Sequence, residues 1–180
     1  SDYLPKCKTS FTGTPVRTDF FLEQPLPSWA PTGEGLLIVV MGGSQGSKKM
    51  NEMVRNVLPW LLDKGCRVVH LTGKNDCFYR NLGQVKTHPN LVCKYFSDEI
   101  PSLLQNADLV ISRAGSSAIC ELLATKIPSI LIPFPQSADN HQEFNAAYMA
   151  KFGGAIIVNQ YNSDDNILKK IISKLVNSNY

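Results

Sequence analysis

Short apolar runs alternate along the chain with longer segments in which apolar residues recur every three to four positions. The apolar runs are continuous, which is typical of strands that are buried on both faces of a parallel sheet. They occupy residues 35–41, 67–71, 91–95, 108–112, 128–132 and 155–158. The helical periodicity falls between and after them, at residues 48–64, 76–82, 98–106, 116–125, 139–152 and 164–176. Strict alternation of strands with helices predicts an α/β fold with a Rossmann-like, doubly wound parallel sheet of about six strands.

The first 34 residues lack this regularity. Prolines at positions 5, 15, 25, 27 and 31 prevent a long helix, and the apolar pattern is limited to Phe20, Phe21 and Leu22. A rigid turn at residues 12–17 ends in the cation Arg17. We therefore predict a connector segment over residues 1–34 and one folded domain over residues 35–180, because this length supports a full core.

Polar loops follow three of the predicted strands, at residues 42–47, 113–117 and 133–142, and the first two of them contain glycine. If the strands take the common order 3-2-1-4-5-6, these loops follow strands one, four and five and meet at the switch point of the sheet. Ligands of open parallel sheets bind at this edge, where helix N-termini favour anions. The topology therefore predicts one binding site at this edge.

The first loop, Gly42-Gly43-Ser44-Gln45-Gly46-Ser47, has glycines where a strand turns into a helix. Backbone N–H groups in such a turn can approach a phosphate closely, although the same glycines also suit a tight turn without a ligand. The spacing matches neither a P-loop nor G-x-G-x-x-G, and the second strand ends in His70-Leu71-Thr72-Gly73 without the acid that holds a ribose in NAD sites. A dinucleotide is therefore disfavoured.

The loop after the fourth strand carries Arg113, Ser116 and Ser117, and Glu121 follows one helical turn later. Arg113 could pair with a phosphate in a bidentate way or simply meet solvent. The two serines suit helix capping as well as ligand binding. Glu121 lies among apolar helical residues, so its carboxylate could accept both hydroxyls of a ribose or belong to a solvated helix face.

The next predicted helix brings His141, Gln142 and Asn145 onto one face, because they are three and four residues apart. Neutral amide and imidazole groups suit sugar hydroxyls, which both donate and accept hydrogen bonds. Asp139 is the expected N-cap of this helix. A single histidine without a carboxylate–histidine cluster does not indicate a metal, and no Ser-His-Asp triad or hydrolytic acid pair is apparent.

Composition narrows the class further. A net charge of +3 is too small to indicate nucleic-acid binding. Five cysteines without a C-x-x-C pair favour reduced thiols over a zinc site or a disulfide framework. The longest apolar run, residues 36–41, is far below the ~20 residues that span a bilayer, and no signal segment opens the chain. We expect a cytoplasmic protein with at most a peripheral membrane association.

Taken together and in this order, the motifs resemble the C-terminal half of the MurG family. The shared segments are residues 12–17, 42–47 and 112–115, Glu121 with Ile127-Pro128, Pro133-Phe134, and His141-Gln142 with Asn145-Ala146. They cover nearly all of the chain. The family consists of bacterial N-acetylglucosaminyltransferases of peptidoglycan synthesis with two Rossmann-like domains, the GT-B type.

The resemblance implies that UDP-N-acetylglucosamine binds mainly to this half. The sugar would pass with inversion to the muramyl C4 hydroxyl of lipid I, an undecaprenyl-pyrophosphoryl-muramyl pentapeptide, giving lipid II. The family's N-terminal domain, whose sequence is absent from these residues, would hold lipid I, the general base and the membrane contact at the cytoplasmic face of the inner membrane. The chain alone is then expected to bind the donor but transfer almost nothing, with no catalytic residue, metal or cofactor of its own.

Individual roles follow from the same resemblance. Glu121 would hold the uridine ribose, and the backbone of Ser97, after Phe96, would read the uracil edge. The groups near the pyrophosphate would be Arg17, Gly43, Ser44, Gln45 and Gly46, with Arg113, Gly115 and Ser116 lining the same crevice. His141 and Gln142 would contact the N-acetylglucosamine hydroxyls beside Asn145. Many members have two glutamines where this chain has His141-Gln142, and Asn is frequent at the position of Thr14.

Two alternatives stay open. A UDP-N-acetylglucosamine epimerase of the same GT-B type would need a catalytic acid or base in this half, and none stands out in the sequence. A nucleotide-sugar-binding subunit of a two-component transferase would be expected to begin at the first strand, whereas this chain carries the proline-rich segment before it. That segment favours the bacterial transferase.

Overall fold

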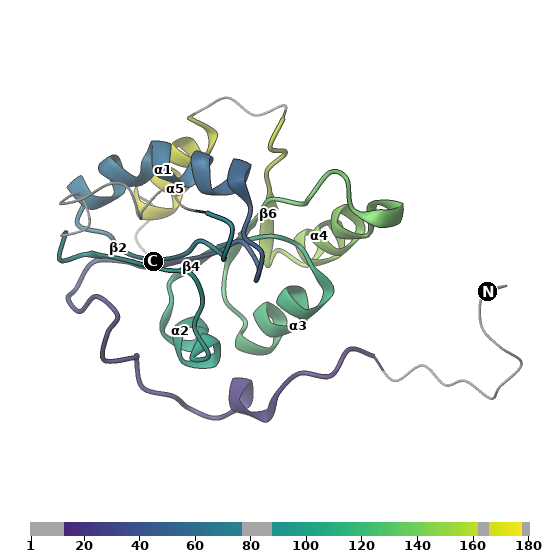
Figure 1. The fold of residues 1–180 in the computed structure, drawn as a ribbon, viewed down its shortest axis with the longest axis horizontal. Coiled ribbons are helices and arrows are strands. Elements are labelled where there is room, and N and C mark those ends of the chain that lie inside the picture. The colour runs from purple at the N-terminus through teal and green to yellow at the C-terminus, as the bar shows by residue number, and fades with distance from the viewer. Residues whose placement is uncertain (1–12, 77–87, 162–165, 178–180) are drawn as a thin grey trace, which may run out of the picture.

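The computed structural model describes residues 13–76, 88–161 and 166–177, in which one parallel sheet lies between two layers of helices (Figure 1). The strands are β1 (Leu37–Met41), β2 (Arg67–Leu71), β3 (Leu91–Lys94), β4 (Leu109–Ser112), β5 (Ser129–Leu131) and β6 (Ala155–Ile157). The helices are α1 (Lys48–Asp63), α2 (Ile100–Asn106), α3 (Ser116–Thr125), α4 (His141–Lys151) and α5 (Ile167–Asn177), with short 3-10 turns η1 (Thr18–Phe21) and η4 (Ala138–Asn140).

All six strands pair in parallel in the order β3-β2-β1-β4-β5-β6. This order and the α/β fold class are those predicted from the sequence. The switch point therefore lies between β1 and β4, and the loops after both strands open at the same sheet edge. The predicted helix at residues 76–82 lies almost entirely outside the described residues, as does the predicted start of the last helix at residue 164.

Strand β1 shows how one sheet supports two cores. Its residues are buried and alternate between the faces, with Leu37, Val39 and Met41 in one core and Ile38 and Val40 in the other. Helices α2, α3 and α4 cover the first face, whereas α1 and α5 cover the second (Figure 1). Because both faces are covered, strands with continuous apolar runs are stable here.

Residues 13–34 pack against the domain along α2 and α3 (Figure 1). The Phe20 ring is 2% exposed and joins the core on that face, as does Ala30. The amides of Gln105 and Asn106 on α2 donate to backbone carbonyls of this segment, including a 2.9 Å bond from Asn106 Nδ2 to Gln24 O. The division between connector and domain at residue 34 stays a prediction, but the connector residues that the structure describes form part of the domain's packing.

The start of α4 differs from the prediction. Asp139 and Asn140 both adopt left-handed backbone conformations, with φ of 49° and 53°. The helix therefore begins at His141, and its N-cap residue is Asn140, without a side-chain capping bond. The assignment of Asp139 as the N-cap was wrong, because a left-handed residue two positions before the helix cannot aim its carboxylate at the first turn.

Candidate nucleotide-sugar site

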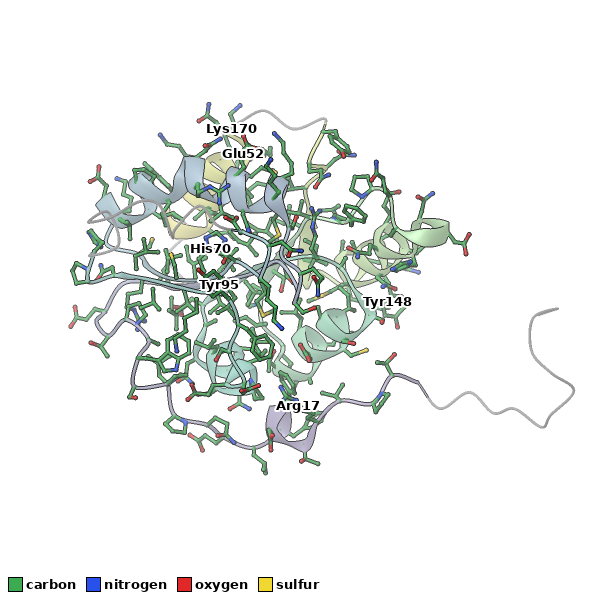
Figure 2. The ribbon with its side chains drawn as sticks, viewed as in Figure 1. Arg17, Glu52, His70, Tyr95, Tyr148 and Lys170 are labelled. Atoms are coloured by element: carbon green, nitrogen blue, oxygen red, sulfur yellow. The ribbon has the colours of Figure 1, made fainter. Side chains whose placement is uncertain are left out.

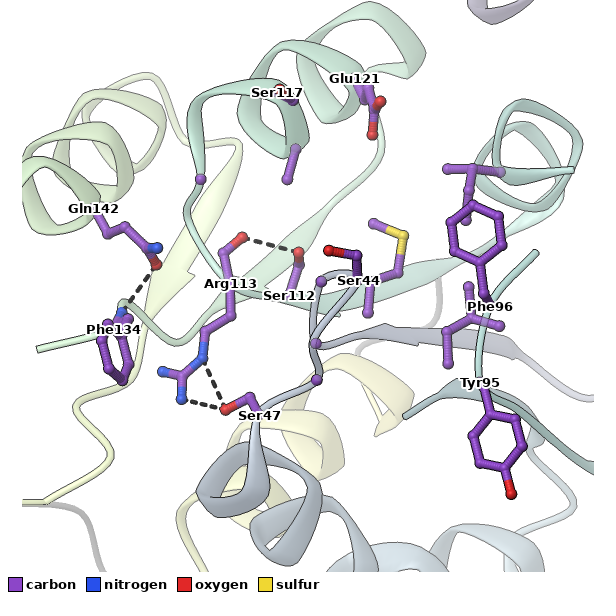
Figure 3. Close-up of a pocket in the computed structure, with 18 of the residues that line it drawn as sticks. Ser44, Ser47, Tyr95, Phe96, Ser112, Arg113, Ser117, Glu121, Phe134 and Gln142 are labelled. Atoms are coloured by element: carbon purple, nitrogen blue, oxygen red, sulfur yellow. Dashed lines mark hydrogen bonds between the residues drawn. The ribbon is translucent and has the colours of Figure 1, made fainter. Parts of the chain in front are cut away.

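A cleft of about 790 Å³ opens at the carboxyl edge of the sheet, at the switch point (Figure 3). Its walls come from the residues that follow β1, β3, β4, β5 and β6 and from α3. The lining consists of Arg17, Met41, Gly42, Gly43, Ser44, Gly46, Ser47, Lys48, Lys49, Leu71, Tyr95, Phe96, Ser97, Asp98, Ile100, Ser112, Arg113, Gly115, Ser117, Ala118, Glu121, Phe134, Gln142, Gln160 and Tyr161. Elements far apart in sequence thus converge on one cleft, as the topology predicted.

The glycine-rich loop leads from β1 into the N-terminus of α1. Gly46 has a φ of 79°, and a Cβ atom there would lie 2.2 Å from the carbonyl oxygen of Thr72. Only glycine fits such a close approach. Ser47 is the N-cap residue but makes no side-chain capping bond, so the free N–H groups of the first turn stay available at the cleft. Lys48 and Lys49 add cationic side chains to this wall.

The N-terminus of α3 faces the same cleft. Gly115 is its N-cap residue, and the first intrahelical bond runs from Ile119 N to Gly115 O at 3.0 Å. Gly115, Ser117 and Ala118 line the cleft, and no side-chain cap consumes the N–H groups that precede Ile119. Two helix N-termini therefore direct their partial positive charge at one space, an arrangement that favours a doubly charged ligand such as a diphosphate.

Arg113 lies between these helices and is only 8% exposed. Its Nη1 donates to the carbonyls of Ile132 (2.8 Å) and Pro133 (2.9 Å), and its Nη2 donates to Gln160 Oε1 at 2.7 Å. Its Nε and Nη2 both donate to Ser47 Oγ. All five N–H donors of the guanidinium are therefore used, and they connect the end of β4 to the residues after β5, β6 and β1.

The charge of Arg113 is not balanced nearby. Among the described residues no carboxylate lies within ion-pair distance of it. Burial lowers the pKa of the guanidinium to about 10, an effect that the Tyr161 phenol opposes. The side chain stays cationic at neutral pH and supplies a positive field to the cleft, although its donors already have partners.

Glu121 lies one turn into α3, with its carboxylate at the cleft. Burial raises the pKa of Glu121, and the guanidinium of Arg17 opposes that shift. Arg17 comes from the segment before β1, where its guanidinium also stacks 5.3 Å above the Phe20 ring. A half-buried carboxylate beside a cation is suited to accepting hydrogen bonds from a ligand hydroxyl pair.

An aromatic wall closes the end of the cleft near β3. Phe96 is 53% exposed and Tyr95 is 38% exposed, whereas Ser97 is buried and accepts a 3.1 Å bond from Glu99 N through its Oγ. Large exposed rings with a buried polar backbone beside them can hold a planar heterocycle by stacking and by hydrogen bonds to its edge.

The opposite end of the cleft contains Gln142 and Phe134 (Figure 3). Gln142 Oε1 accepts a 3.0 Å bond from Phe134 N, which orients the amide and leaves its Nε2 outside this bond. Asn145 lies outside the cleft lining and donates from Nδ2 to Ala114 O at 3.0 Å, which fixes the loop before α3. Asn145 therefore contacts the loop before α3 instead of the cleft itself.

Ten of the fourteen predicted site residues line the cleft, namely Arg17, Gly43, Ser44, Gly46, Phe96, Ser97, Arg113, Gly115, Glu121 and Gln142. Gln45, Ser116, His141 and Asn145 do not. Gln45 instead accepts a 3.3 Å bond from Asn75 Nδ2. The serine that lines the cleft at the start of α3 is Ser117, not Ser116. The roles of all fourteen stay predictions.

Several lining residues did not emerge from the sequence. Lys48 and Lys49 follow the glycine-rich loop directly, and two cations after such a loop are a signal that spacing alone could have given. Gln160 and Tyr161 follow the sixth strand, whose end adjoins β5 in the predicted order. The same topological reasoning, extended by one strand, would have included them.

Two absences hold for the described residues. They contain no cluster of three or more His, Cys, Asp or Glu side chains that could hold a metal ion. None of their helices has both the length and the apolar character that a membrane span requires.

Comparison with known proteins decides the family. The model of the glycosyltransferase family 28 C-terminal domain matches residues 37–180. The chain belongs to this family. The described fold agrees with the assignment, since the family 28 match begins at the first residue of β1 and includes all six strands.

Named relatives agree with this family 28 assignment. The chain is 73% identical over 179 residues to the UDP-N-acetylglucosamine--N-acetylmuramyl-(pentapeptide) pyrophosphoryl-undecaprenol N-acetylglucosamine transferase of Prochlorococcus marinus (strain NATL2A), covering 99% of this chain and 51% of that protein. It is 54% identical to the protein of the same name from Synechococcus sp. (strain CC9902), covering 96% and 47%. The chain thus spans about half the length of the curated relatives it matches.

Among solved structures, the crystal structure of Acinetobacter baumannii MurG matches with a TM-score of 0.67 and 26% identity, covering 81% of this chain and 42% of that one. The predicted resemblance to the C-terminal half of the MurG family is therefore confirmed, as is the GT-B fold class of this family 28 domain.

Proposed function

We propose that this chain is the donor-binding half of an N-acetylglucosaminyltransferase that moves N-acetylglucosamine from UDP-N-acetylglucosamine to lipid I, giving lipid II in peptidoglycan synthesis. Support comes from the names of its relatives, which are N-acetylglucosamine transferases acting on an N-acetylmuramyl-(pentapeptide) pyrophosphoryl-undecaprenol. The relatives are about twice as long, so the acceptor-binding half is expected outside these residues.

One observation carries the proposal, the order of chemical groups along the cleft. Figure 3 shows the Phe96 ring at one end, Glu121 and Ser44 next along the cleft, Arg113 beyond them, and Gln142 at the far end. A UDP-sugar has the same order of parts, from base to ribose to diphosphate to sugar. We assign Phe96 and Ser97 to uracil, Glu121 to the ribose, the α1 and α3 N-termini to the diphosphate, and Gln142 to the sugar.

This arrangement suits departure of a UDP leaving group. Negative charge grows on the diphosphate as the glycosidic bond breaks, and fixed backbone N–H groups stabilise it without reorganising. The cationic side chains of Arg17, Lys48 and Lys49 and the buried Arg113 add to the same field. The domain needs no metal ion in this mechanism, and the acceptor hydroxyl would be deprotonated by a base from the other half of the enzyme.

The other half of the enzyme would also set the location. Lipid I is membrane-bound, so we expect the complete enzyme to work as a peripheral protein at the cytoplasmic face of the bacterial inner membrane, with no nucleic-acid partner. Without that half, both reactants cannot be held in one cleft, and the isolated chain should transfer almost no sugar.

Calorimetric titration of the 180-residue chain tests the proposal, with UDP-N-acetylglucosamine, UDP-N-acetylgalactosamine, UDP and NAD as ligands. We expect saturable binding of UDP and of its N-acetylglucosamine conjugate, weaker binding of the galacto epimer and no binding of NAD. NMR of the incubated donor should show no epimer, which an epimerase would produce. The proposal fails if NAD binds instead, or if no uridine nucleotide binds either here or in a two-domain protein containing this half.

A further inference from the structure

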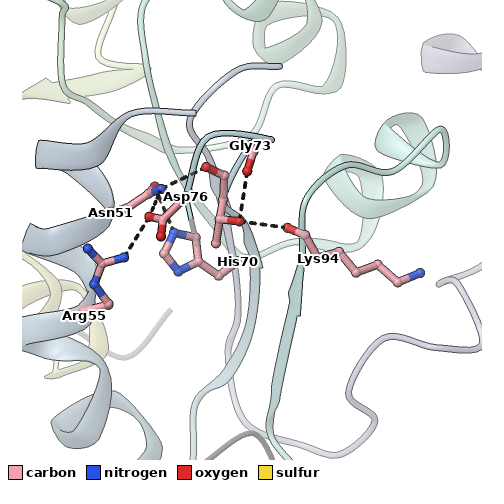
Figure 4. Close-up of polar contacts among 7 residues, drawn as sticks. Asn51, Arg55, His70, Gly73, Asp76 and Lys94 are labelled. Carbon is pink, nitrogen blue, oxygen red and sulfur yellow. Dashed lines mark hydrogen bonds and ion pairs between the residues drawn. The ribbon is translucent and has the colours of Figure 1, made fainter. Parts of the chain in front are cut away.

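A buried polar cluster lies behind the glycine-rich loop, outside the cleft lining (Figure 4). It contains Asn51 of α1, His70 of β2 and Asp76, which follows β2, and we call it the Asn51 cluster. Asn51 and His70 are both 0% exposed in an otherwise apolar core between α1 and the sheet. Buried polar side chains of this kind are costly unless they are hydrogen-bonded, so their presence calls for a structural or functional reason.

The hydrogen bonds of Asn51 fix the cluster in one arrangement. Asn51 Nδ2 donates to Thr72 O at 2.9 Å and to Asp76 Oδ2 at 2.6 Å, which uses both of its hydrogens. Asn51 Oδ1 must then face His70 Nε2, 3.1 Å away, and the imidazole must donate from that nitrogen. Arg55 Nη1 lies 2.8 Å from Asp76 Oδ2 and completes the charge balance of the carboxylate.

The turn that Asn51 holds, residues 72–76, is the one against which the glycine-rich loop packs. Lys74 N donates to Ser44 O at 3.2 Å, and Asn75 N donates to Gln45 O at 3.3 Å. The two backbones touch so closely that a Cβ atom at Gly73 would lie 2.1 Å from Gly46 Cα. Any movement of the turn must therefore move the loop as well.

Resting on the proposed function, we propose that Asn51, His70 and Asp76 are positioning residues that set the glycine-rich loop for the diphosphate of the donor. They touch no ligand atom themselves. The hydrogen bonds of Asn51 hold the start of α1 against the turn after β2. That turn contacts the backbone of residues 44–46 at the cleft and supports it. The same turn also extends the β2–β3 pairing, since Thr72 N donates to Lys94 O and Gly73 N to Tyr95 O. These are backbone bonds of the sheet and Glu121 lies on α3, so the cluster should affect the diphosphate more strongly than the uracil and ribose ends.

The test compares UDP with uridine in calorimetric titrations of single variants of the whole chain. In Asn51→Leu, we expect the affinity for UDP to fall by at least about tenfold, because the loop N–H groups lose their alignment, while uridine binding changes less than about twofold. His70→Leu should behave in the same way. His70→Gln should stay close to the wild type, because a glutamine amide can still donate to Asn51 Oδ1.

Asn56→Leu is the matched control, since Asn56 is also an asparagine of α1 but is exposed and lies outside the cleft lining. General destabilisation would either lower the affinities for UDP and uridine together or leave both unchanged. The ratio of the two affinities therefore isolates the positioning role. An unchanged ratio in folded Asn51→Leu or His70→Leu protein would overturn the inference. A wild-type chain that binds no UDP would instead overturn the proposed function.

A second measurement needs no ligand. Amide hydrogen exchange of Lys74 and Asn75 reports the two bonds between the turn and the loop directly. We expect exchange of both amides to accelerate at least about tenfold in His70→Leu but not in His70→Gln, with the amides of β4 unchanged. Equal protection in both variants would contradict the inference, whatever the affinities are.

Discussion

Arg113 shows at the residue scale how one side chain can organise a site without offering it a free donor. All five of its N–H groups donate to neutral oxygen atoms in loops that follow three other strands, β1, β5 and β6. A lysine has only three donors on a point charge and cannot reproduce this planar arrangement.

We therefore expect Arg113→Lys to lower the free energy of unfolding by roughly 2–4 kcal/mol, because buried acceptors lose their partners. Urea denaturation measures this loss. Arg17→Lys is the control, since Arg17 is exposed and should change the unfolding free energy by less than about 0.5 kcal/mol. Equal losses in the two variants would show that the contacts of Arg113 do not stabilise the fold.

Glu121 is the residue whose loss should weaken donor binding most. Glu121→Ala removes the acceptor proposed for the ribose hydroxyls, so we expect UDP affinity to fall by about 100-fold, equivalent to ~3 kcal/mol for hydrogen bonds to a charged group. Titration with UDP checks it, with Glu34→Ala as the control, since Glu34 is exposed and lies outside the cleft lining. Unchanged affinity in Glu121→Ala would remove Glu121 from the site.

His70 gives the domain a pH-dependent stability. Burial lowers its pKa from 6.5 to about 4, with Arg55 adding to the shift and Asp76 opposing it. Between these two values the unfolded chain binds more protons than the folded one, so stability falls as the pH drops from about 6.5 to about 4. Above about pH 6.5, His70 is neutral in both the folded and the unfolded chain, and its protonation no longer reduces the free energy of unfolding.

We expect this contribution to reach roughly 3 kcal/mol when integrated over the window. Denaturation curves measured from pH 7 to pH 4 in wild type and in His70→Gln separate it from the carboxylates, which titrate in both proteins. Identical pH profiles in the two proteins would contradict the prediction.

The sequence predicted some of these residues and not others for a physical reason. Glu121 and the glycine-rich loop could be singled out because their signals are local, a carboxylate on an apolar helix and glycines at a strand end. The ribose role of Glu121 came only from the family resemblance. The four acceptors of Arg113 come from Ser47, Ile132, Pro133 and Gln160, which only the folded sheet brings together. The sequence analysis used the segment of His70 only to show that no acidic residue follows the second strand. The hydrogen bond of His70 to Asn51 could not be predicted, because nothing in the sequence reveals that the two residues meet.

At the scale of elements, periodicity located the strands and most helices but missed the packing of residues 13–34. The apolar residues of this segment are separated by prolines and follow no helical or strand period. Phe20 nevertheless lies in the core below α2 and α3 while its neighbour Phe21 is 67% exposed. Tertiary contacts decide which of the two adjacent rings is buried.

This pair provides a matched test. Phe20→Ala should lower the free energy of unfolding by about 3 kcal/mol, because it removes a buried ring and leaves a cavity. Phe21→Ala should change it by less than about 0.5 kcal/mol, since the ring is already in water. Thermal or urea unfolding of both variants measures the difference, and similar values would mean that the segment does not pack as described.

At the scale of the whole molecule, the predicted strand order 3-2-1-4-5-6 did most to predict the site. Alternating strands and helices predict a doubly wound sheet, for which this order is the common one, and the order brings the loops after β1, β4 and β5 to one cleft. It could not distinguish Ser117 from Ser116, because a helix must be positioned before its facing side chains are known.

The same molecular picture predicts that donor binding does not require a divalent cation. The charge near the proposed diphosphate comes from helix N-termini and basic side chains, and the described residues contain no carboxylate cluster for a metal. UDP affinity should therefore stay within about twofold when magnesium is replaced by EDTA. A loss of binding in EDTA that magnesium restores would contradict this mechanism.

Burying the charge of Arg113 also connects the lifetime of the protein to its ligand. With the cleft empty, a cation sits in the interior beside two helix N-termini of the same sign. A bound diphosphate relieves that repulsion, and any ligand that binds only the folded state lowers the population of unfolded chains. Digestion by a protease should accordingly slow as UDP is added, so the domain would persist longest where nucleotide is plentiful.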